Sequence, residues 1–350
     1  MDEGNKKERT TGRDNLVQSN QLSSELPHRI FNHVSGEFAD RFNRLPFALS
    51  HNLAAHPLFE LPRLVELAKT LWAGGGGRVA IIGADASVEN RWDEIPNKAR
   101  SFIEAIRGIQ QSGSWLMLKS SQEDPEYRAC IDLCVSELSE LTGVDLKKEI
   151  TWIDGYVFIA SPGAMTPHHM DHESNFLLQI HGEKNLNVSD PGDRSVLFEE
   201  EIENYYIGDI SAARFKPVSQ EKAYVFPMAP GTGAHIPSKG PHWVRNGEEY
   251  SVSFSINFCM REIDIKSRIY QCNHYLRKAG FTPTVPGRSA VKDRLKIMAL
   301  SSLGRGEPAN KFELLRHGVK RLESASRIVE KVLRRSTNSH HGTVEPEAKS

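Results

Sequence analysis

The feature that most constrains the fold is a His-x-Asp pair that is followed, much later in the chain, by a further histidine. The pair lies in the run Thr166-Pro167-His168-His169-Met170-Asp171, and the distant residue is His242. Side chains two positions apart on a strand point to the same side, so His169 and Asp171 are expected to converge while Met170 points away. For His242 to reach the same point, an early and a late strand must be neighbours, as in a barrel.

Two imidazoles and one carboxylate are the ligand set of mononuclear iron(II) oxygenases, which leave the opposite metal positions open. The alternative is a polar loop that binds nothing, because His-x-Asp also arises by chance in a chain with 14 histidines. His168 and His172 stand at odd offsets, so they are expected at the surface or in a hydrogen bond to a ligand carboxylate. His235 is the other candidate for the third ligand, but its place before Ile236-Pro237 indicates that it packs or faces solvent.

Around this pair the chain resembles the JmjC-type, cupin-like oxygenases that depend on iron and 2-oxoglutarate, in particular the asparaginyl hydroxylase that inhibits hypoxia-inducible factor. The similarity covers roughly residues 151–262. It is carried by segments that agree in type, order and spacing: Thr166-Pro167-His168-His169-Met170-Asp171, Asn175, Gln179-Ile180-His181-Gly182-Glu183-Lys184, Ile236-Pro237, His242 and Ile256-Asn257-Phe258. The chain departs from the family just before the late histidine, where Pro241 stands and the aromatic Trp243 follows instead.

The resemblance implies a site and a reaction. The residues that would bind Fe(II) are His169, Asp171 and His242. Those that would contact 2-oxoglutarate or line its pocket are Thr166, Asn175, Lys184 and Asn257, with Lys184 and Thr166 on the distal carboxylate. The implied reaction consumes O2 and 2-oxoglutarate, releases succinate and CO2, and oxidises a C–H bond of a protein side chain or a small molecule. Hydroxylation is favoured over demethylation, because no chromatin-reading module or zinc motif accompanies the predicted barrel.

Lys184 is the residue that best separates this hypothesis from its alternatives. A buried lysine is costly unless it is paired, and a carboxylate end group would supply the partner. On the residues alone, a surface lysine in the turn after Gly182 is the alternative. A cupin-like regulatory protein that binds a metal or ligand without turnover would be indicated by loss of the lysine or of a metal ligand, and neither is lost. An iron enzyme without 2-oxoglutarate would not need Lys184 and Thr166 together.

The pattern along the chain predicts a mainly β protein with flanking helices and, given the resemblance, a double-stranded β-helix (jelly-roll) core. Strands are expected at 78–83, 115–119, 156–160, 175–180, 185–188, 223–227 and 250–258, and helices at 56–72, 98–111, 125–142, 263–279, 289–301 and 311–334. The last strand alternates, with Val252, Phe254 and Ile256 on one face and Ser253, Ser255 and Asn257 on the face toward the pocket. The predicted segments are a disordered 1–22, an α/β part 23–148 packed on the barrel, the β-helix 149–262, a helical part 263–334 and a disordered tail 335–350.

Composition limits the partners. The formal net charge of −1 gives no overall field that would attract nucleic acid or a membrane, and no apolar run reaches membrane-spanning length. Residues 1–21 lack the apolar core of a secretory signal, and the 4 cysteines form no Cys-x-x-Cys pair, so we expect a cytoplasmic protein with buried cysteines. The helix at 311–334 would either pack on the barrel or, as the family resemblance implies, form a homodimer. The acidic run Glu199, Glu200, Glu201 and Glu203 is expected to be solvated, with an acidic lid as the alternative.

Overall fold

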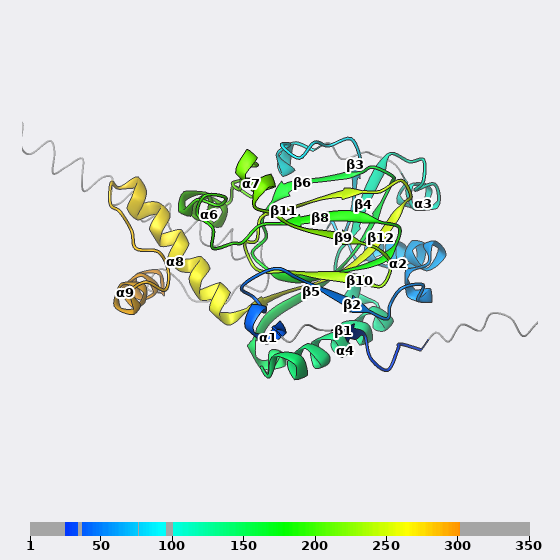
Figure 1. Ribbon diagram of the computed structural model, residues 1–350, viewed down its shortest axis with the longest axis horizontal. Helices are drawn as coiled ribbons and strands as arrows, with labels where there is room; N and C mark the ends of the chain where they lie inside the picture. Colours follow the sequence, from blue (N-terminus) through cyan, green and yellow to red (C-terminus); the bar gives the residue numbers. More distant parts are fainter. Residues whose placement is uncertain (1–24, 34–36, 76, 96–100, 302–350) are drawn as a thin grey trace, which may run out of the picture.

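Two facing β-sheets form the centre of the molecule in the computed structural model (Figure 1). The structure describes residues 25–33, 37–75, 77–95 and 101–301. The predicted disordered segment 1–22, the helix at 311–334 and the tail 335–350 therefore lie outside the described residues. Nothing in the described chain is a helix long and apolar enough to cross a membrane.

The larger sheet has 8 strands and the smaller sheet has 4, and every pairing is antiparallel. In spatial order, the larger sheet contains β1 (Phe31–His33), β2 (Phe47–His51), β10 (Thr232–Ile236), β7 (Ser174–His181), β12 (Ser251–Met260), β5 (Ile150–Ala160), β4 (Ser114–Leu118) and β3 (Val79–Gly83). The smaller sheet contains β6 (Met165–His169), β11 (His242–Asn246), β8 (Lys184–Val188) and β9 (Tyr224–Met228). From β5 onward the chain passes repeatedly from one sheet to the other. This is the predicted double-stranded β-helix.

Alternation along β12 fixes which face of the larger sheet looks inward. Val252, Phe254 and Ile256 are buried in the largest hydrophobic core, on the outer face that helices cover. Ser255 and Asn257 lie on the opposite face and line a cavity between the sheets. The predicted division of this strand into an apolar and a polar face is confirmed.

Helices cover the sheets from several sides. The α-helices are α1 (Phe38–Arg41), α2 (Leu61–Ala73), α3 (Phe102–Arg107), α4 (Pro125–Thr142), α5 (Leu146–Glu149), α6 (Glu199–Tyr206), α7 (Pro217–Glu221), α8 (Arg261–Lys278) and α9 (Ala290–Ser301). Short 3-10 turns are η1 (Pro57–Phe59), η2 (Trp92–Glu94) and η3 (Ser121–Glu123). In Figure 1, α6 to α9 lie at one end of the sheets, and α1 and α4 lie below them.

Helix α4 illustrates how local signals set the boundaries of an element. The carboxylate of Asp124 accepts a hydrogen bond from the backbone N–H of Glu126, and Pro125 occupies the first turn, where no N–H is needed. At the other end Gly143 adopts a φ of 69°, the left-handed conformation in which glycine costs least. The predicted boundaries, 125–142 with Gly143 as the stop, are confirmed.

A second, smaller hydrophobic core lies between α6 and α8. Its residues, which we call the α6–α8 core, are Met170, Leu197, Ile202, Tyr205, Tyr206, Ala212, Ala213 and Tyr270. The prediction that the acidic run of α6 is solvated is wrong for two of its members. Glu203 is 1% exposed and binds Arg277 at 2.8 Å, and Glu201 is buried against Lys216 at 2.6 Å. The helix turns these two carboxylates inward, where cations from other segments neutralise them.

Candidate active site

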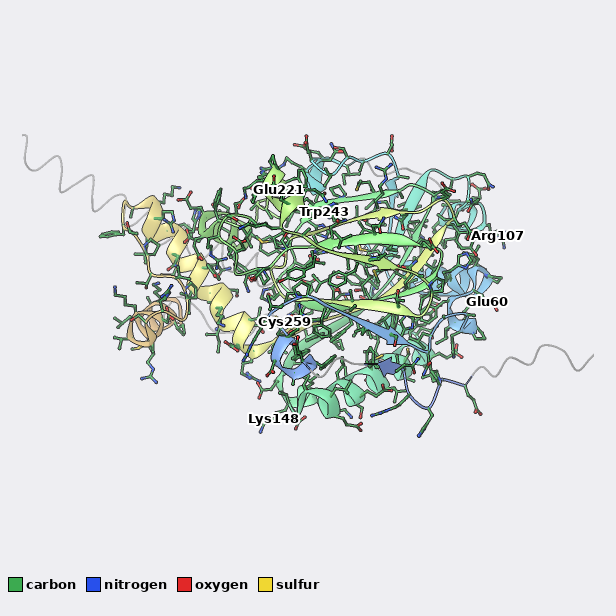
Figure 2. The ribbon with its side chains drawn as sticks, viewed as in Figure 1. Glu60, Arg107, Lys148, Glu221, Trp243 and Cys259 are labelled. Carbon is green, nitrogen blue, oxygen red and sulfur yellow. The ribbon has the colours of Figure 1, made fainter. Side chains whose placement is uncertain are left out.

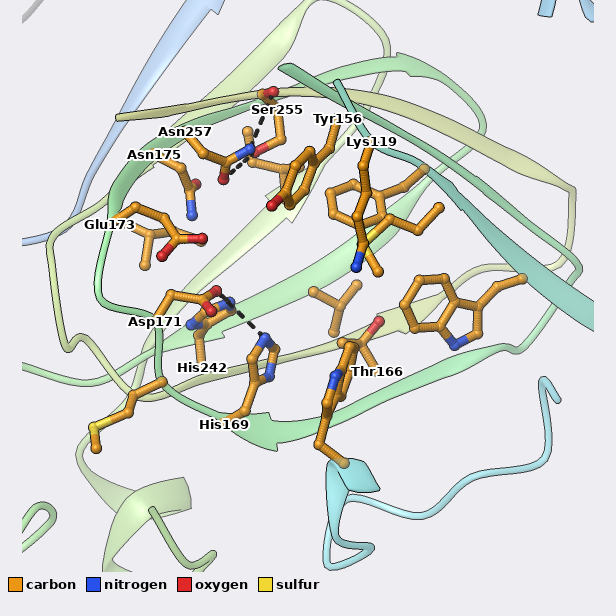
Figure 3. Close-up of a pocket in the computed structure, with 18 of the residues that line it drawn as sticks. Lys119, Tyr156, Thr166, His169, Asp171, Glu173, Asn175, His242, Ser255 and Asn257 are labelled. Carbon is orange, nitrogen blue, oxygen red and sulfur yellow. Dashed lines mark hydrogen bonds and ion pairs between the residues drawn. The ribbon is translucent and has the colours of Figure 1, made fainter. Parts of the chain in front are cut away.

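The pairing of β6 with β11 brings the predicted metal ligands together. His169 and His242 are register partners across these two strands. The Oδ2 atom of Asp171 lies 3.7 Å from Nε2 of His169 and 3.9 Å from Nε2 of His242. Strand β6 ends at His169, so Asp171 comes from the following loop rather than from the strand, which corrects the expected geometry. Figure 3 shows the three side chains converging at one side of the cavity.

Hydrogen bonds determine which nitrogen of each histidine faces this point. Nδ1 of His169 lies 2.7 Å from the carbonyl oxygen of Pro167, and Nδ1 of His242 lies 3.0 Å from that of Gly240. A carbonyl can only accept, so each Nδ1 must carry the hydrogen. The lone pair is therefore on Nε2, the atom that faces Asp171. Two imidazole nitrogens in this tautomer and one carboxylate suit a divalent transition metal such as iron(II).

A tryptophan that the sequence did not single out covers one side of this group. The ring of Trp92 stacks on His169, with centroids 4.8 Å apart and planes 19° from parallel. Two hydrogen bonds fix the segment that carries Trp92. The backbone N–H of Trp92 donates to the Ser211 hydroxyl at 3.1 Å, and the carbonyl of Val88, four residues earlier, accepts from the backbone N–H of His168 at 3.0 Å. The ring therefore limits how far the His169 imidazole can turn.

A cavity of about 140 Å³ extends from the three residues into the space between the sheets. All seven residues predicted for the site line it: Thr166, His169, Asp171, Asn175, Lys184, His242 and Asn257. Thr166 and Lys184 belong to the smaller sheet, whereas Asn175 and Asn257 lie side by side as register partners on neighbouring strands of the larger one. The two sheets thus form opposite walls of one pocket.

Lys184 brings a buried positive charge into this cavity. It is 7% exposed, and its ammonium has no hydrogen-bond or ion-pair partner within the described ranges. Burial lowers the pKa of Lys184 to about 7. A buried ammonium is strongly disfavoured unless an anion pairs with it. The cavity therefore has a place for an anionic group at this wall.

The two asparagines differ in how far the protein satisfies them. Asn257 accepts a hydrogen bond from the Ser255 hydroxyl at 3.1 Å and donates one to the carbonyl of Asp154 at 3.1 Å (Figure 3). The Oδ1 atom of Asn175 is buried without a hydrogen-bond partner in the part of the chain that the structure describes. Such atoms are rare in folded proteins, so Asn175 is suited to accept a hydrogen bond from a ligand or a bound water.

Four further polar residues line the cavity and were not predicted for the site: Lys119, Tyr156, Glu173 and Asn246. Lys119 directly follows β4, and its ammonium points into the cavity in Figure 3. Trp115 and Met117 line the same cavity, as expected from the two-residue period of a strand. The predicted strand at 115–119 contained this alternation, but the sequence did not tell which face of it would meet the pocket.

His168, His172 and His235, the other candidate histidines of the motif region, are all buried. Burial lowers the pKa of His168 to about 4, and its ring packs between Phe215 and Trp243. His235 lies in the aromatic core, with Nδ1 2.9 Å from the Asn175 carbonyl, so it packs as expected and is not near the metal ligands. The surface alternative for His168 and His172 is wrong, because both residues are buried.

Comparison with known proteins identifies a relative that carries a Jumonji C domain, although no family model matches the chain. The chain is 27% identical over 177 residues to Jumonji C domain-containing protein 5 of Drosophila melanogaster, a match that covers 48% of this chain and 40% of that protein. The chain thus spans well under two thirds of the length of this curated relative.

Similar solved structures include two of YcfD from Escherichia coli. One has 15% identity and a TM-score of 0.47, and covers 79% of this chain and 70% of that chain. The other, described as a ribosomal oxygenase in complex with cobalt and 2-oxoglutarate, has 15% identity and a TM-score of 0.44, and covers 79% of this chain and 68% of that chain. The likeness to a Jumonji C domain protein over 48% of the sequence confirms the family resemblance that the motifs predict.

Proposed function

We propose that the protein is an oxygenase that depends on Fe(II) and 2-oxoglutarate. The observation that carries this proposal is that one cavity contains both a two-histidine, one-carboxylate group and a buried lysine that lacks a counter-ion among the described residues. Either feature by itself would also suit a protein that only binds a metal or only binds an anion. Together they match the needs of a cosubstrate that binds a metal at one end and carries a carboxylate at the other.

The residues that would hold iron are His169, Asp171 and His242. Iron bound there would activate O2 and couple the oxidative decarboxylation of 2-oxoglutarate to oxidation of a substrate C–H bond. The hydrogen bonds from Nδ1 to backbone carbonyls would keep both imidazoles in the tautomer that a metal requires. Trp92 would hold the His169 ring against rotation.

Lys184 and Thr166 would bind the distal carboxylate of 2-oxoglutarate. The ammonium of Lys184 would supply the charge, and the hydroxyl of Thr166 a directed hydrogen bond. Pairing would stabilise the charged form of Lys184 and so raise its pKa above the value of about 7 that burial imposes. Asn175 and Asn257 would form the opposite wall, with the side-chain Oδ1 atom of Asn175 placed to accept a hydrogen bond from a ligand or water.

Lys119 and Glu173 are charged residues of the cavity that neither the metal nor the cosubstrate needs, so we assign them to the substrate side. The substrate is a protein side chain or a small molecule, and we favour hydroxylation over demethylation because the sequence has no chromatin-reading module or zinc motif. A homodimer through the C-terminal helices remains a prediction, since the helix at 311–334 lies outside the described residues. A cytoplasmic location also remains a prediction.

The test is an anaerobic titration with Fe(II) and then 2-oxoglutarate, followed by visible absorption. A charge-transfer band that is absent in His169→Ala and weakened in Lys184→Ala supports the proposal. His181→Ala and Lys148→Ala are matched controls, since neither residue lines the cavity. A wild-type protein that gives no band contradicts the proposal and favours a non-catalytic, cupin-like binding protein or an enzyme with another cosubstrate.

A further inference from the structure

The two neighbours of Asp171 in the chain both pack toward α6 and α8, although Met170 also touches the wall of the cavity. Met170 is 1% exposed and belongs to the α6–α8 core, and His172 is completely buried beside the same core. The side chains of Asp171 and Glu173 line the cavity. The loop that carries the aspartate ligand therefore has one face in the site and the other face attached to α6 and α8.

His172 is held by side chains from both helices. Its Nδ1 lies 2.9 Å from the hydroxyl of Tyr206, at the end of α6, and its Nε2 lies 2.9 Å from Oδ1 of Asp264, in the first turn of α8. Its backbone N–H donates to the hydroxyl of Tyr205 at 3.1 Å. Its carbonyl accepts a hydrogen bond from the hydroxyl of Ser238 at 2.6 Å. Both ring nitrogens and both backbone polar groups of His172 thus have protein partners.

The same loop is bonded to the segment that leads to the late histidine. The backbone N–H of Lys239 donates to the carbonyl of Asp171 at 2.8 Å, and that of Ser238 donates to the hydroxyl of Ser174 at 3.0 Å. Any rotation of residue 171 would strain these bonds together with those of His172. The direction of the Asp171 carboxylate is consequently determined by residues on both sides of it.

We propose that Asp264 is a positioning residue that orients Asp171 for metal binding, acting through the imidazole of His172. This inference rests on the proposed metal centre. The chain of contacts runs from α8 through the carboxylate of Asp264 and the ring of His172 to the peptide that carries Asp171. Partners of this kind behind a ligand change metal affinity by roughly 10–100-fold when they are removed.

A cysteine next to this pair raises the alternative of a second metal site. The thiol of Cys259 lies 2.9 Å from Nε2 of His172 and 2.9 Å from Oδ1 of Asp264. Cys259 is close to the end of β12, where the sheet meets α8 (Figure 2). Tetrahedral ligands at ordinary zinc bond lengths stand roughly 3.3–3.7 Å apart, so the 2.9 Å spacing fits hydrogen bonds better than a bound ion.

The protonation states agree with a hydrogen-bonded group. Burial raises the pKa of the Cys259 thiol, which therefore keeps its proton. Burial alone would raise the pKa of Asp264, but hydrogen bonds from His172 and Cys259 lower it, so the carboxylate is ionised. Asp264 can then accept from both the thiol and the Nε2–H of His172, and Nδ1 accepts from the Tyr206 hydroxyl.

The experiment is a titration of the full-length protein with Co(II), followed by visible d–d absorption. Asp264→Ala removes the acceptor for His172, whereas Asp264→Asn keeps an oxygen in the same place. Glu262→Ala is the matched control, because Glu262 is in the same turn of α8 but pairs with the exposed Lys266 on that helix. We expect Asp264→Ala to weaken Co(II) binding about 10–100-fold and alter the band shape, Asp264→Asn to restore affinity to within about threefold, and Glu262→Ala to change neither.

The outcomes separate this inference from the proposed function. Asp264→Ala with the wild-type dissociation constant, or with a loss equal to that of Glu262→Ala, overturns the positioning role. A second Co(II) ion per chain that disappears in Cys259→Ala overturns the hydrogen-bonded assignment. Should Asp264→Ala fail to fold, Tyr206→Phe tests the same chain by removing one hydroxyl, with a several-fold weakening expected and wild-type affinity contradicting it. A wild-type protein that binds no Co(II) contradicts the proposed function itself.

Discussion

Two groups of potential metal ligands lie close together in this molecule, and they differ in burial and in hydrogen bonding. The first contains His169, Asp171 and His242, and the second contains His172, Cys259 and Asp264. The first lines the cavity, whereas the histidine and cysteine of the second are completely buried. Each group brings three potential ligand atoms within 4.8 Å of one another. The kinds of residue therefore do not decide which group binds a metal.

The histidine contacts and the spacing distinguish the two groups. In the first, Nδ1 of both imidazoles binds a backbone carbonyl, and Nε2 stands 3.7 and 3.9 Å from the carboxylate. In the second, both nitrogens of His172 bind side chains at 2.9 Å, which leaves no lone pair for an ion. A histidine that binds a metal needs one ring nitrogen held by a hydrogen bond and the lone pair of the other ring nitrogen directed at the metal. Of the two groups in the described chain, the first meets that requirement and the second does not.

The largest expected effect comes from removing a ligand of the first group. His169→Ala or Asp171→Ala should abolish binding of Fe(II) or Co(II), because two protein ligands do not hold these ions at micromolar concentration in competition with water. Cys259→Ala should keep one metal per chain. Metal analysis after gel filtration measures the stoichiometry, and circular dichroism checks the fold. Stoichiometric metal in the His169 variant would disprove the ligand assignment.

The next effect concerns the cosubstrate. Lys184→Ala should weaken 2-oxoglutarate binding by more than a hundredfold, since removing one partner of a buried ion pair costs roughly 3–5 kcal/mol. Calorimetric titration of the Co(II)-loaded protein measures the dissociation constant, with Lys148→Ala as the control on an exposed lysine. An unchanged constant would mean that Lys184 does not contact the cosubstrate.

The affinity for 2-oxoglutarate is also expected to depend on pH. Burial lowers the pKa of Lys184 to about 7, and a carboxylate binds only the charged form. Affinity for 2-oxoglutarate should therefore be greatest below pH 7 and fall by up to about tenfold per unit as the pH rises above 7. The variant Lys184→Met should bind weakly with a flat profile over this range. A wild-type profile that is also flat from pH 6 to 9 would contradict the assignment.

Several features of the fold and of the candidate site could be predicted from the sequence alone. The boundaries of α4 were predictable because Asp124, Pro125 and Gly143 act within one turn of the helix ends. The two faces of β12 were predictable because alternation is a property of the strand itself. The predicted residues of the site all line one cavity, because their motif preserves order and spacing.

What escaped prediction depends on contacts between distant segments. Nothing near His172 in the sequence reveals that its partners come from α6 and α8. The burial of Glu203 likewise requires Arg277, far along the chain. Lys119 was within a predicted strand, but its face became known only once β4 was paired with β5. Local sequence patterns therefore predict the elements and the motifs, whereas the direction in which their side chains point depends on how distant strands and helices pack.

The smallest expected effect distinguishes the two lysines of the cavity. Lys119 extends from the larger sheet, opposite the smaller sheet that carries Lys184 and Thr166. If it faces the substrate, Lys119→Ala should change the dissociation constant of 2-oxoglutarate by less than about threefold, in contrast to Lys184→Ala. The same titration of the Co(II)-loaded protein measures both variants. A loss in Lys119→Ala as large as in Lys184→Ala would instead place both cations on the cosubstrate, and Lys119 would no longer be assigned to the substrate.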